Sequence, residues 1–488
     1  MFAASIVPRG LGIKYYGDFS YLENFYTQIL NFFDTGTSIG YYTKISSRPE
    51  EYKMTRFYWG FYLISILIIT LTVVSFHLLG FSASIWPKIN YVYVLLAMFL
   101  GFITWGHNLV AKIIDAYALT TKGEITKIFQ KVIGVLALFL LLTVDYLNLR
   151  NYYIFQYIIL GFLVVSWWKI LHNNHIPLFP KIKLLFSDIR KYSNEFYSYS
   201  SPLIVFAFFA LIIGIFDRWI LQYIYGSAEQ GYFGLAFRIS GLIFIFTSAL
   251  TPLILREFSI EYHKLNIKKM RQLFSRYIPL LYFVAAFFAV FVSVHAHEIA
   301  TLVGGSQFES ASISLMIISF YPLHQTYGQL CGSLFYATGK TTLYRNIGIL
   351  FMLIGLPLTF FLLAPKTMFG MNMGAIGLAI KMVVIQLVWV NALLWYNVKF
   401  LKLSFKYFLF HQITTVIILL LPALLVNYIS YRVCVNQYFA FFISGLIYST
   451  IVFFIVYFLP STINMSRQEI IDLKSNLVNK IRNNGIRK

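Results

Sequence analysis

Apolar stretches long enough to cross a lipid bilayer recur along the whole chain. Residues 57–74, for example, include no charged side chain, and a helix that spans the hydrocarbon core needs about 20 predominantly apolar residues. Hydrophobic residues make up 59% of the chain and charged residues only 12%, whereas soluble proteins carry about 25% charged residues. The sequence therefore predicts an all-α polytopic membrane protein.

Further stretches of similar character are predicted to span the membrane. Together with 57–79, which contains the stretch above, they lie at 91–116, 125–147, 153–171, 202–225, 232–256, 277–294, 310–337, 346–363, 373–397, 408–429 and 438–459. The stretch 19–45 is predicted to span as well, although Asn24, Gln28, Asn31 and Asp34 make it amphipathic. Cys331 and Cys434 lie in different predicted helices, so no disulfide framework or metal cluster is expected.

The net charge of +21 is explained by topology. Most of the lysines and arginines fall in alternate loops, among them the loop 256–276 and the C-terminal tail. Short loops rich in lysine and arginine stay in the cytoplasm, so this side, with the C-terminus, is predicted to be cytoplasmic. A nucleic-acid partner is not expected, and the lipid bilayer is the expected environment.

Charged residues inside the apolar stretch 203–240 indicate a function. Asp217, Arg218 and Arg238 each lie where a charge costs about 2.5–3.5 kcal/mol on insertion scales. Gly226 and Gly231 flank a turn between two antiparallel helices, so both arginines lie about 10–12 Å inside the same membrane face. Charges at one depth favour a polar cavity, and hence transport. Asp217 paired with Arg238 as a structural contact between the helices is an equal alternative.

Other polar residues within predicted spans are further candidates. Lys381 lies about 12 Å deep by helical rise and is predicted to be a lumen-facing cation. Asp34 is a candidate for proton coupling, or a carboxylate satisfied by neighbouring threonines.

One predicted helix carries its polar residues on a single face. Thr104, Asn108, Lys112 and Asp115 are spaced at i, i+4, i+4 and i+3, which places them on the same side. An interfacial ion pair between Lys112 and Asp115 is the favoured interpretation, and an inner gate or entry site is the functional alternative.

Two glycine turns echo each other along the chain. Gly226 and Gly231 form a G-x4-G pattern with an aromatic residue close behind it, and so do Gly12 and Gly17. Both turns lie on the predicted outer face between spans, which is typical of transporters built from two related halves.

The chain resembles a known family, the polysaccharide transporters of the multidrug/oligosaccharidyl-lipid/polysaccharide exporter superfamily, especially Wzx-like O-antigen flippases. The resemblance rests on G-L-G-I-K-Y-Y-G-D-F-S (10–20), on D-R-W-I-L-Q-Y-I-Y-G-S-A-E-Q-G-Y-F-G-L-A-F-R-I (217–239), on L-F-Y-A-T-G-K (334–340) and on G-A-I-G-L-A (374–379). These segments span nearly the whole chain in the family's order.

The resemblance implies two pseudo-symmetric six-helix bundles around a central lumen, plus two C-terminal helices. The expected parts are an N-terminal bundle (1–171), a cytoplasmic linker with an amphipathic basic helix (172–201), a C-terminal bundle (202–397), two additional transmembrane helices (398–460) and an amphipathic cytoplasmic tail (461–488). Only eight residues precede Arg9, so the first family helix is expected to be truncated.

The implied function is translocation of undecaprenyl-pyrophosphate-linked oligosaccharide, an O-antigen or capsule repeat unit, across the bacterial inner membrane. Arg218, Arg238 and Lys381 would bind the anionic cargo, while Asp34, Asp217, Lys112 and Asp115 would serve coupling or gating. No cofactor or metal and no enzymatic activity are expected, and a polysaccharide polymerase is a candidate partner. The alternatives are a drug/cation antiporter of the same superfamily and, in a different class, a membrane glycosyltransferase or polysaccharide polymerase.

Overall fold

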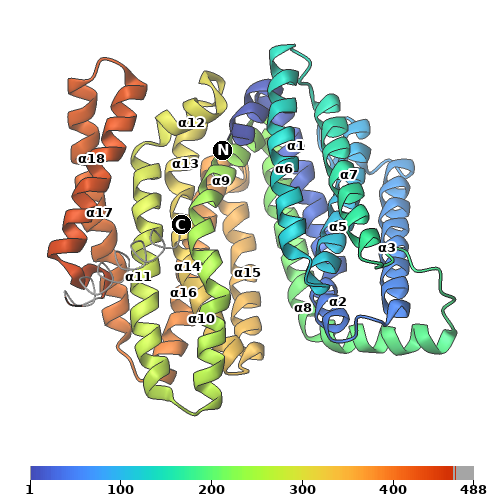
Figure 1. Ribbon diagram of the computed structural model, residues 1–488. Helices are drawn as coiled ribbons and strands as arrows, with labels where there is room; N and C mark the ends of the chain where they lie inside the picture. Colours follow the sequence, from blue (N-terminus) through green and yellow to red (C-terminus); the bar gives the residue numbers. More distant parts are fainter. Residues whose placement is uncertain (1, 465–467, 469–488) are drawn as a thin grey trace, which may run out of the picture. The chain divides into compact units, whose positions relative to one another are not determined.

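In a computed structural model that describes residues 2–464 and 468, every regular element is a helix (Figure 1). The α-helices are α1 (Phe2–Asp34), α2 (Thr37–Ser47), α3 (Tyr52–Leu78), α4 (Ser82–Ile85), α5 (Tyr91–Ala116), α6 (Thr120–Thr143), α7 (Leu149–Asn173), α8 (Phe186–Tyr225), α9 (Ser227–Gly241), α10 (Ile245–His263), α11 (Ile267–Val294), α12 (Ala296–Gly304), α13 (Ala311–Ile318), α14 (Phe320–Ala337), α15 (Thr341–Leu363), α16 (Gly374–Leu401), α17 (Phe405–Val433) and α18 (Gln437–Phe458). Within the described residues, 11 helices are long and apolar enough to cross a membrane. The predicted all-α polytopic architecture is confirmed.

One of the predicted spans is broken. Within 19–45 the chain leaves the helix at Thr35 and Gly36, whose φ angles are 26° and 77°, so α1 and α2 are separate helices. Within 310–337, only Ser319 separates α13 from α14, and its backbone is helical (φ −57°, ψ −25°), so the chain does not leave the helical conformation there. Neither stretch is among the 11 apolar spans. Hydropathy could not predict the interruption, because polar residues in a span are compatible both with a break in the helix and with a helix face that lines a lumen.

The described chain divides into two compact units. The first holds the chain up to Gly234 together with Gly355–Ala375, and the second holds Leu235–Ile354 together with the chain from Ile376 onward. Helix α8 therefore belongs to the first unit, whereas the sequence-based boundary at residue 202 assigned its second part to the C-terminal bundle. The reason is close packing along α1, where the Asn24 amide donates to the Gly214 carbonyl at 2.9 Å.

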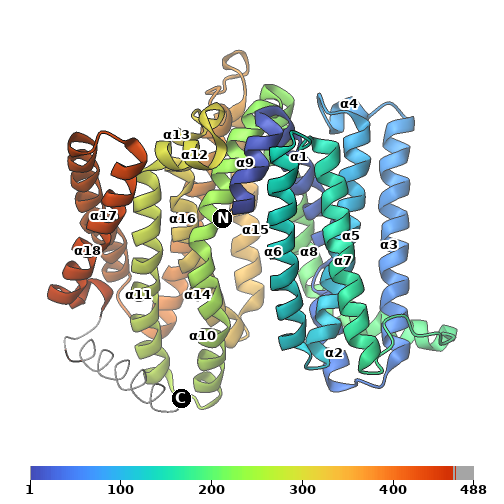
Figure 2. The same ribbon diagram turned by 45° about the horizontal axis from the view of Figure 1, so that its top comes forward.

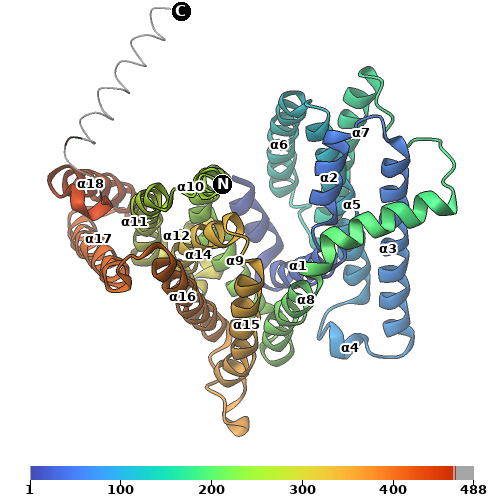
Figure 3. The same cartoon turned by 90° about the horizontal axis from the view of Figure 1, so that it is seen from below.

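Helix α8 is continuous over 40 residues and includes Pro202. The amphipathic helix predicted for the linker thus runs into the membrane span without a loop between them. In Figure 1 and from below in Figure 3, its first part crosses the ends of α2 and α3 before the second part runs along the bundle. Pro202 removes one backbone donor from the helix, which is a common cause of such a bend.

Ion pairs fasten the first part of α8 to α2 and to the start of α3. Glu195 and Glu51 each contact two basic side chains, and Asp188 contacts one. The pairs are Glu195 with Lys44 (2.9 Å) and Arg48 (2.9 Å), Glu51 with Arg48 (2.9 Å) and Lys191 (2.7 Å), and Asp188 with Lys53 (2.9 Å). Because several charges share partners, they form a network rather than isolated surface pairs.

The two glycine turns have the same backbone conformation. Gly12, at a kink within α1, has φ 72° and ψ 170°, and Gly226, at the end of α8, has φ 81° and ψ −166°. The turns also contact each other reciprocally. A Cβ on Gly17 would lie 1.7 Å from the Ser227 carbonyl oxygen, and one on Gly231 would lie 2.5 Å from the Ile13 carbonyl oxygen. Each turn thus places a carbonyl so close to the other turn that only a glycine fits opposite it.

The second unit is built around α11, which packs against α10, α14 and α17 (Figure 2). Small side chains on α11, including Ala285, Ala286 and Ala289, are almost fully buried and allow close helix approach. Helices α17 and α18 pair with each other, and the Tyr448 hydroxyl donates to the Phe287 carbonyl on α11 at 3.2 Å. The amphipathic helix predicted in the tail lies outside the described residues, except for Gln468.

Candidate functional site

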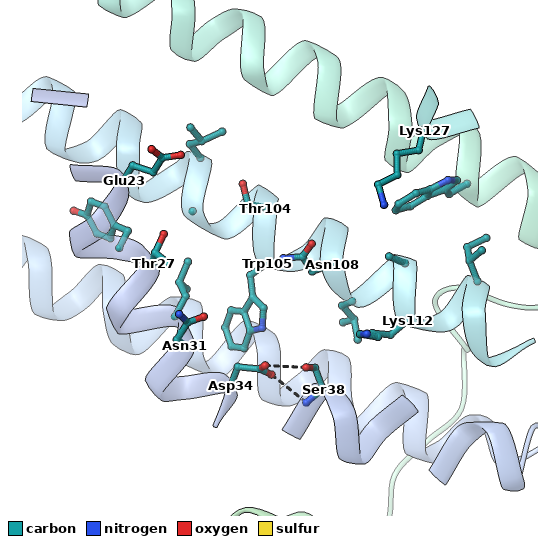
Figure 4. Close-up of a pocket in the computed structure, with 18 of the residues that line it drawn as sticks. Glu23, Thr27, Asn31, Asp34, Ser38, Thr104, Trp105, Asn108, Lys112 and Lys127 are labelled. Carbon is teal, nitrogen blue, oxygen red and sulfur yellow. Dashed lines mark hydrogen bonds between the residues drawn. The ribbon is translucent and has the colours of Figure 1, made fainter. Parts of the chain in front are cut away.

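The first unit encloses a polar cavity of about 590 Å³ between α1, α2, α5, α6 and α7. Its wall combines apolar residues with hydroxyl, amide, ammonium and carboxylate groups (Figure 4). Inside a bundle of membrane helices such groups are costly unless they face one another or a polar space. The cavity is therefore the best candidate for a site that handles a polar ligand.

One row of polar side chains comes from α1. Glu23, Thr27, Asn31 and Asp34 follow i, i+4, i+4, i+3 spacing and all line the cavity (Figure 4). By helical rise the row is about 16 Å long. Asn24, on an adjacent face of the same helix, is bonded to α8 instead. The helix thus uses one polar face for the cavity and another for packing.

A second row, with the same spacing, comes from α5. Thr104, Asn108, Lys112 and Asp115 line the cavity, and Figure 4 shows the first three of them opposite the α1 row. The predicted ion pair between Lys112 and Asp115 is not formed among the described residues. The Lys112 ammonium instead lies 5.6 Å from the centre of the Tyr42 ring, a distance at which a cation and an aromatic face attract each other.

Helix α6 adds an ion pair at the same end of the cavity as Lys112. The Lys127 ammonium lies 2.9 Å from the Glu124 carboxylate, and both residues line the cavity. Gly123 lets α6 pass close to α5 and α7, since a Cβ there would lie 2.7 Å from the Ile114 side chain. Its carbonyl accepts a hydrogen bond from the Trp167 indole at 3.2 Å.

The Asp34 carboxylate is held by donors from three residues. Ser38 donates through its backbone N–H at 3.0 Å and its hydroxyl at 2.8 Å, Thr37 donates through its hydroxyl at 3.2 Å, and Tyr58 donates through its hydroxyl at 3.3 Å. The carboxylate thereby caps the first turn of α2 after the break in the chain. Of the two interpretations of the sequence, the satisfied carboxylate matches this geometry.

Arg218 lies outside the cavity wall. Its side chain is 7% exposed, its guanidinium donates to the Gln230 side-chain oxygen at 3.0 Å, and it lies 4.3 Å from the centre of the Phe233 ring. The arginine therefore joins α8 to α9. Asp217, its neighbour, accepts a hydrogen bond from the Thr359 hydroxyl on α15 at 2.7 Å.

The other two predicted cations belong to the second unit. Arg238 is in the last turn of α9 and is partly exposed, whereas Lys381 on α16 is only 5% exposed. Neither lines the cavity of the first unit. Their roles in binding an anionic cargo remain predictions.

The cavity also uses residues that the sequence did not single out. Glu23, Glu124 and Lys127 are the charged ones, and Tyr26 and Tyr153 belong to the wall as well. The α1 row had a detectable signal, because Glu23, Thr27, Asn31 and Asp34 repeat the spacing found on α5. The α6 residues had none, since their position at a predicted cytoplasmic loop suggested only topology.

The chain matches no protein-family model and no curated protein, but solved structures match most of its length. "Lipid II flippase MurJ, inward closed conformation" has a TM-score of 0.69 at 16% identity, with 95% of this chain and 96% of that chain covered. "Inward-facing conformation of a multidrug resistance MATE family transporter of the MOP superfamily" has a TM-score of 0.67 at 15% identity, with 82% and 94% covered.

This chain has the fold of these polytopic transporters. A MOP superfamily transporter from Pyrococcus furiosus is also similar, with a TM-score of 0.51 at 13% identity and with 83% of this chain and 96% of that chain covered. At such identities the similarity establishes the fold, and function has to be argued from the site.

Proposed function

We propose that this protein is a flippase that moves an undecaprenyl-pyrophosphate-linked oligosaccharide across the bacterial inner membrane by alternating access. The observation that carries the proposal is the polar cavity of about 590 Å³ inside a bundle of membrane helices. A lipid-linked glycan needs such a space, because its sugars and phosphates cannot enter hydrocarbon while its polyprenyl tail stays in the lipid.

The groups of the cavity suit this cargo. Ammonium groups such as that of Lys112 attract phosphate oxygens, and amide and hydroxyl groups such as those of Asn31 and Thr104 can hydrogen-bond to sugar hydroxyls. In this proposal Arg218, Arg238 and Lys381 are further cations that bind the anionic cargo. An ion gradient would drive transport, the C-terminus would lie in the cytoplasm, and a polysaccharide polymerase would take up the product.

The test uses the full chain reconstituted in lipid vesicles. Lipid-linked oligosaccharide is placed in the inner leaflet, and a glycosidase that cannot cross the membrane is added outside. The glycan should become cleavable faster than it does in protein-free vesicles. Replacing Arg218 or Lys381 by alanine should abolish transport while membrane insertion is retained. Equal rates of glycan cleavage with and without the protein would contradict the proposal. Full transport activity of both variants would show that Arg218 and Lys381 are not needed to bind the cargo.

A second candidate, a drug/cation antiporter, is favoured by one observation. Four residues of the cavity wall carry carboxylates, Glu23, Asp34, Asp115 and Glu124, and two carry ammonium groups, Lys112 and Lys127. An acidic cavity suits a cationic drug. Uptake of a fluorescent organic cation against a proton or sodium gradient, with no change in glycan accessibility, would select this alternative.

A further inference from the structure

The cavity has an uncharged middle between two charged ends. Thr27 and Asn31 on α1 lie opposite Thr104 and Asn108 on α5 (Figure 4). Glu23 lies at one end of this region, one turn before Thr27. The ammonium groups of Lys112 and Lys127, with their neighbouring carboxylates, form the other end.

Three of the four side chains of this middle region are not used by the protein, whereas the Asn108 side-chain oxygen lies 3.2 Å from His107 Nδ1. Threonines elsewhere in the helices donate to the carbonyl four residues earlier, as Thr72 does to Ile68 at 2.9 Å. Thr27 and Thr104 make no such bond, and the Asn31 side chain has no hydrogen-bond partner among the described residues. These three residues are nevertheless exposed to the cavity. Their hydrogen-bonding capacity is therefore available to a ligand.

Two tyrosines of the same wall do not add to this capacity. The side chains of Tyr26 and Tyr153 are 2% and 0% exposed, and neither hydroxyl has a hydrogen-bond partner in the described part of the chain. Because these hydroxyls are buried, a ligand in the cavity would meet the exposed side chains of Thr27, Asn31 and Thr104 instead.

At the charged end, Lys112 is the cation best placed for an anion. It makes no ion pair with a described residue and lies 5.6 Å from the centre of the Tyr42 ring. Lys127 is already paired with Glu124 at 2.9 Å. The Asp34 carboxylate at this end is engaged by Thr37, Ser38 and Tyr58.

We propose that the uncharged middle, formed by Thr27, Asn31, Thr104 and Asn108, is a carbohydrate subsite and that Lys112 binds the adjoining phosphate. This assignment rests on the proposed flippase function. It fixes the direction of the cargo: the phosphate lies at the end of the cavity near Lys112, and the sugars extend along α1 and α5 toward Glu23. The sugars bound in the middle are neutral, because the four side chains there carry no charge.

The experiment compares two probes on the full chain in lipid nanodiscs: undecaprenyl pyrophosphate, and the same lipid carrying an oligosaccharide. Binding is followed by quenching of tryptophan fluorescence, since Trp105 and Trp167 line the cavity. The double variant Asn31→Leu, Thr104→Val should bind the glycan-bearing lipid about tenfold more weakly, because hydrogen bonds to the sugar are lost. Its affinity for the sugar-free lipid should not change. Lys112→Met should weaken the binding of both lipids.

Thr72→Val is the matched control, because it removes a hydroxyl that is bonded within its own helix, and it should leave both affinities unchanged. The double variant should keep its thermal stability, since neither side chain has a protein partner to lose. If the double variant weakens the binding of both lipids equally, or of neither, the carbohydrate subsite is refuted while the flippase proposal stands. If the unmodified protein binds neither lipid, the flippase proposal itself fails.

Discussion

Gly17 occupies a place where no larger residue fits. A Cβ there would lie 1.7 Å from the Ser227 carbonyl oxygen, and a backbone atom cannot move aside as a flexible side chain can. We expect Gly17→Ala to lower stability by about 3 kcal/mol, at the upper end of what overpacking costs. Thermal unfolding in detergent measures the loss.

Gly161 provides the control for this substitution. A Cβ at this position on α7 meets nothing within 4 Å, and alanine stabilises the interior of a helix relative to glycine. Gly161→Ala should therefore leave the unfolding temperature unchanged or raise it. A Gly17→Ala variant as stable as the unmodified protein would show that the two turns are not in contact.

Asp34 is expected to act through hydrogen bonds rather than through proton transfer. Asp34→Ala should cost about 1–2 kcal/mol of stability, as the loss of a helix cap usually does. Asp34→Asn keeps one acceptor oxygen for Ser38, Thr37 or Tyr58 and should lose less. Thermal unfolding and ion-coupled transport, measured on both variants, separate the two roles. If both variants lose ion coupling equally and keep the stability of the unmodified protein, Asp34 acts as a proton carrier instead.

At this scale the sequence shows which residues are polar but not which neighbour each one meets. The spacing of Thr104, Asn108, Lys112 and Asp115 was enough to place them on one face. It could not reveal that Lys112 lies over Tyr42 instead of pairing with Asp115, because Tyr42 is on another helix. The free hydroxyls of Tyr26 and Tyr153 were likewise invisible, since a missing partner is a property of the packed bundle.

At the scale of elements, the attachment of α8 to α2 and α3 depends on carboxylates. Partial burial acts to raise the pKa of Glu51, but hydrogen bonds from Lys191 and Tyr192 and the charge of Arg48 outweigh it and hold the pKa below its usual 4.5. A carboxyl whose pKa is lowered on folding stabilises the protein above its unfolded pKa, and this contribution is lost as the pH falls through the folded value. The attachment should therefore weaken on acidification below about pH 4.5.

Glu51→Gln tests this attachment. We expect a loss of about 1 kcal/mol at pH 7, because the partners are partly exposed, and a smaller loss in 1 M salt. The difference from the unmodified protein should shrink as the pH is lowered from 5 to 3, in thermal unfolding followed by circular dichroism. Glu257→Gln is the control, because Glu257 is 4.0 Å from Arg256 and exposed, and it should have no effect at any pH. A Glu51→Gln effect independent of pH would contradict an ionic contribution.

Most elements could be predicted from hydropathy, whereas their interruptions could not. Apolar stretches such as 57–79 and 408–429 correspond to helices α3 and α17, because a helix lets an apolar segment of that length satisfy its own backbone hydrogen bonds in lipid. The break at Thr35 and Gly36 depends instead on a carboxylate that caps the following helix. The continuity of α8 was also missed, since a basic amphipathic stretch and an apolar stretch look like separate elements.

For the whole molecule, the orientation in the membrane is the prediction to check. A reporter fused within 264–266, between α10 and α11, should give a signal only if it is one that is active in the cytoplasm, because the lysines and arginines of 256–276 keep this connection inside. A fusion within 365–373, between α15 and α16, should report the outer side. An outer signal from the first fusion would reverse the topology.

The fold class was accessible from composition and apolar length, and the transporter fold was expected from short segments scattered along the chain. What the sequence did not contain is the division of the molecule. Residues 202–234 pack with the first unit because α8 lies along α1, a contact between segments far apart in the chain. The cavity has the same origin, since its two rows of polar residues meet only after the bundle has assembled.

The reciprocal contact of the glycine turns also limits how this sequence can evolve. The Ser227 carbonyl can lie where it does only because residue 17 is glycine, and the Ile13 carbonyl only because residue 231 is glycine. An insertion in either turn would displace its own glycine and also the carbonyl that packs against the glycine of the other turn. Variation in the two turns is therefore coupled: their lengths should change together or not at all among homologues, even where the surrounding side chains have diverged.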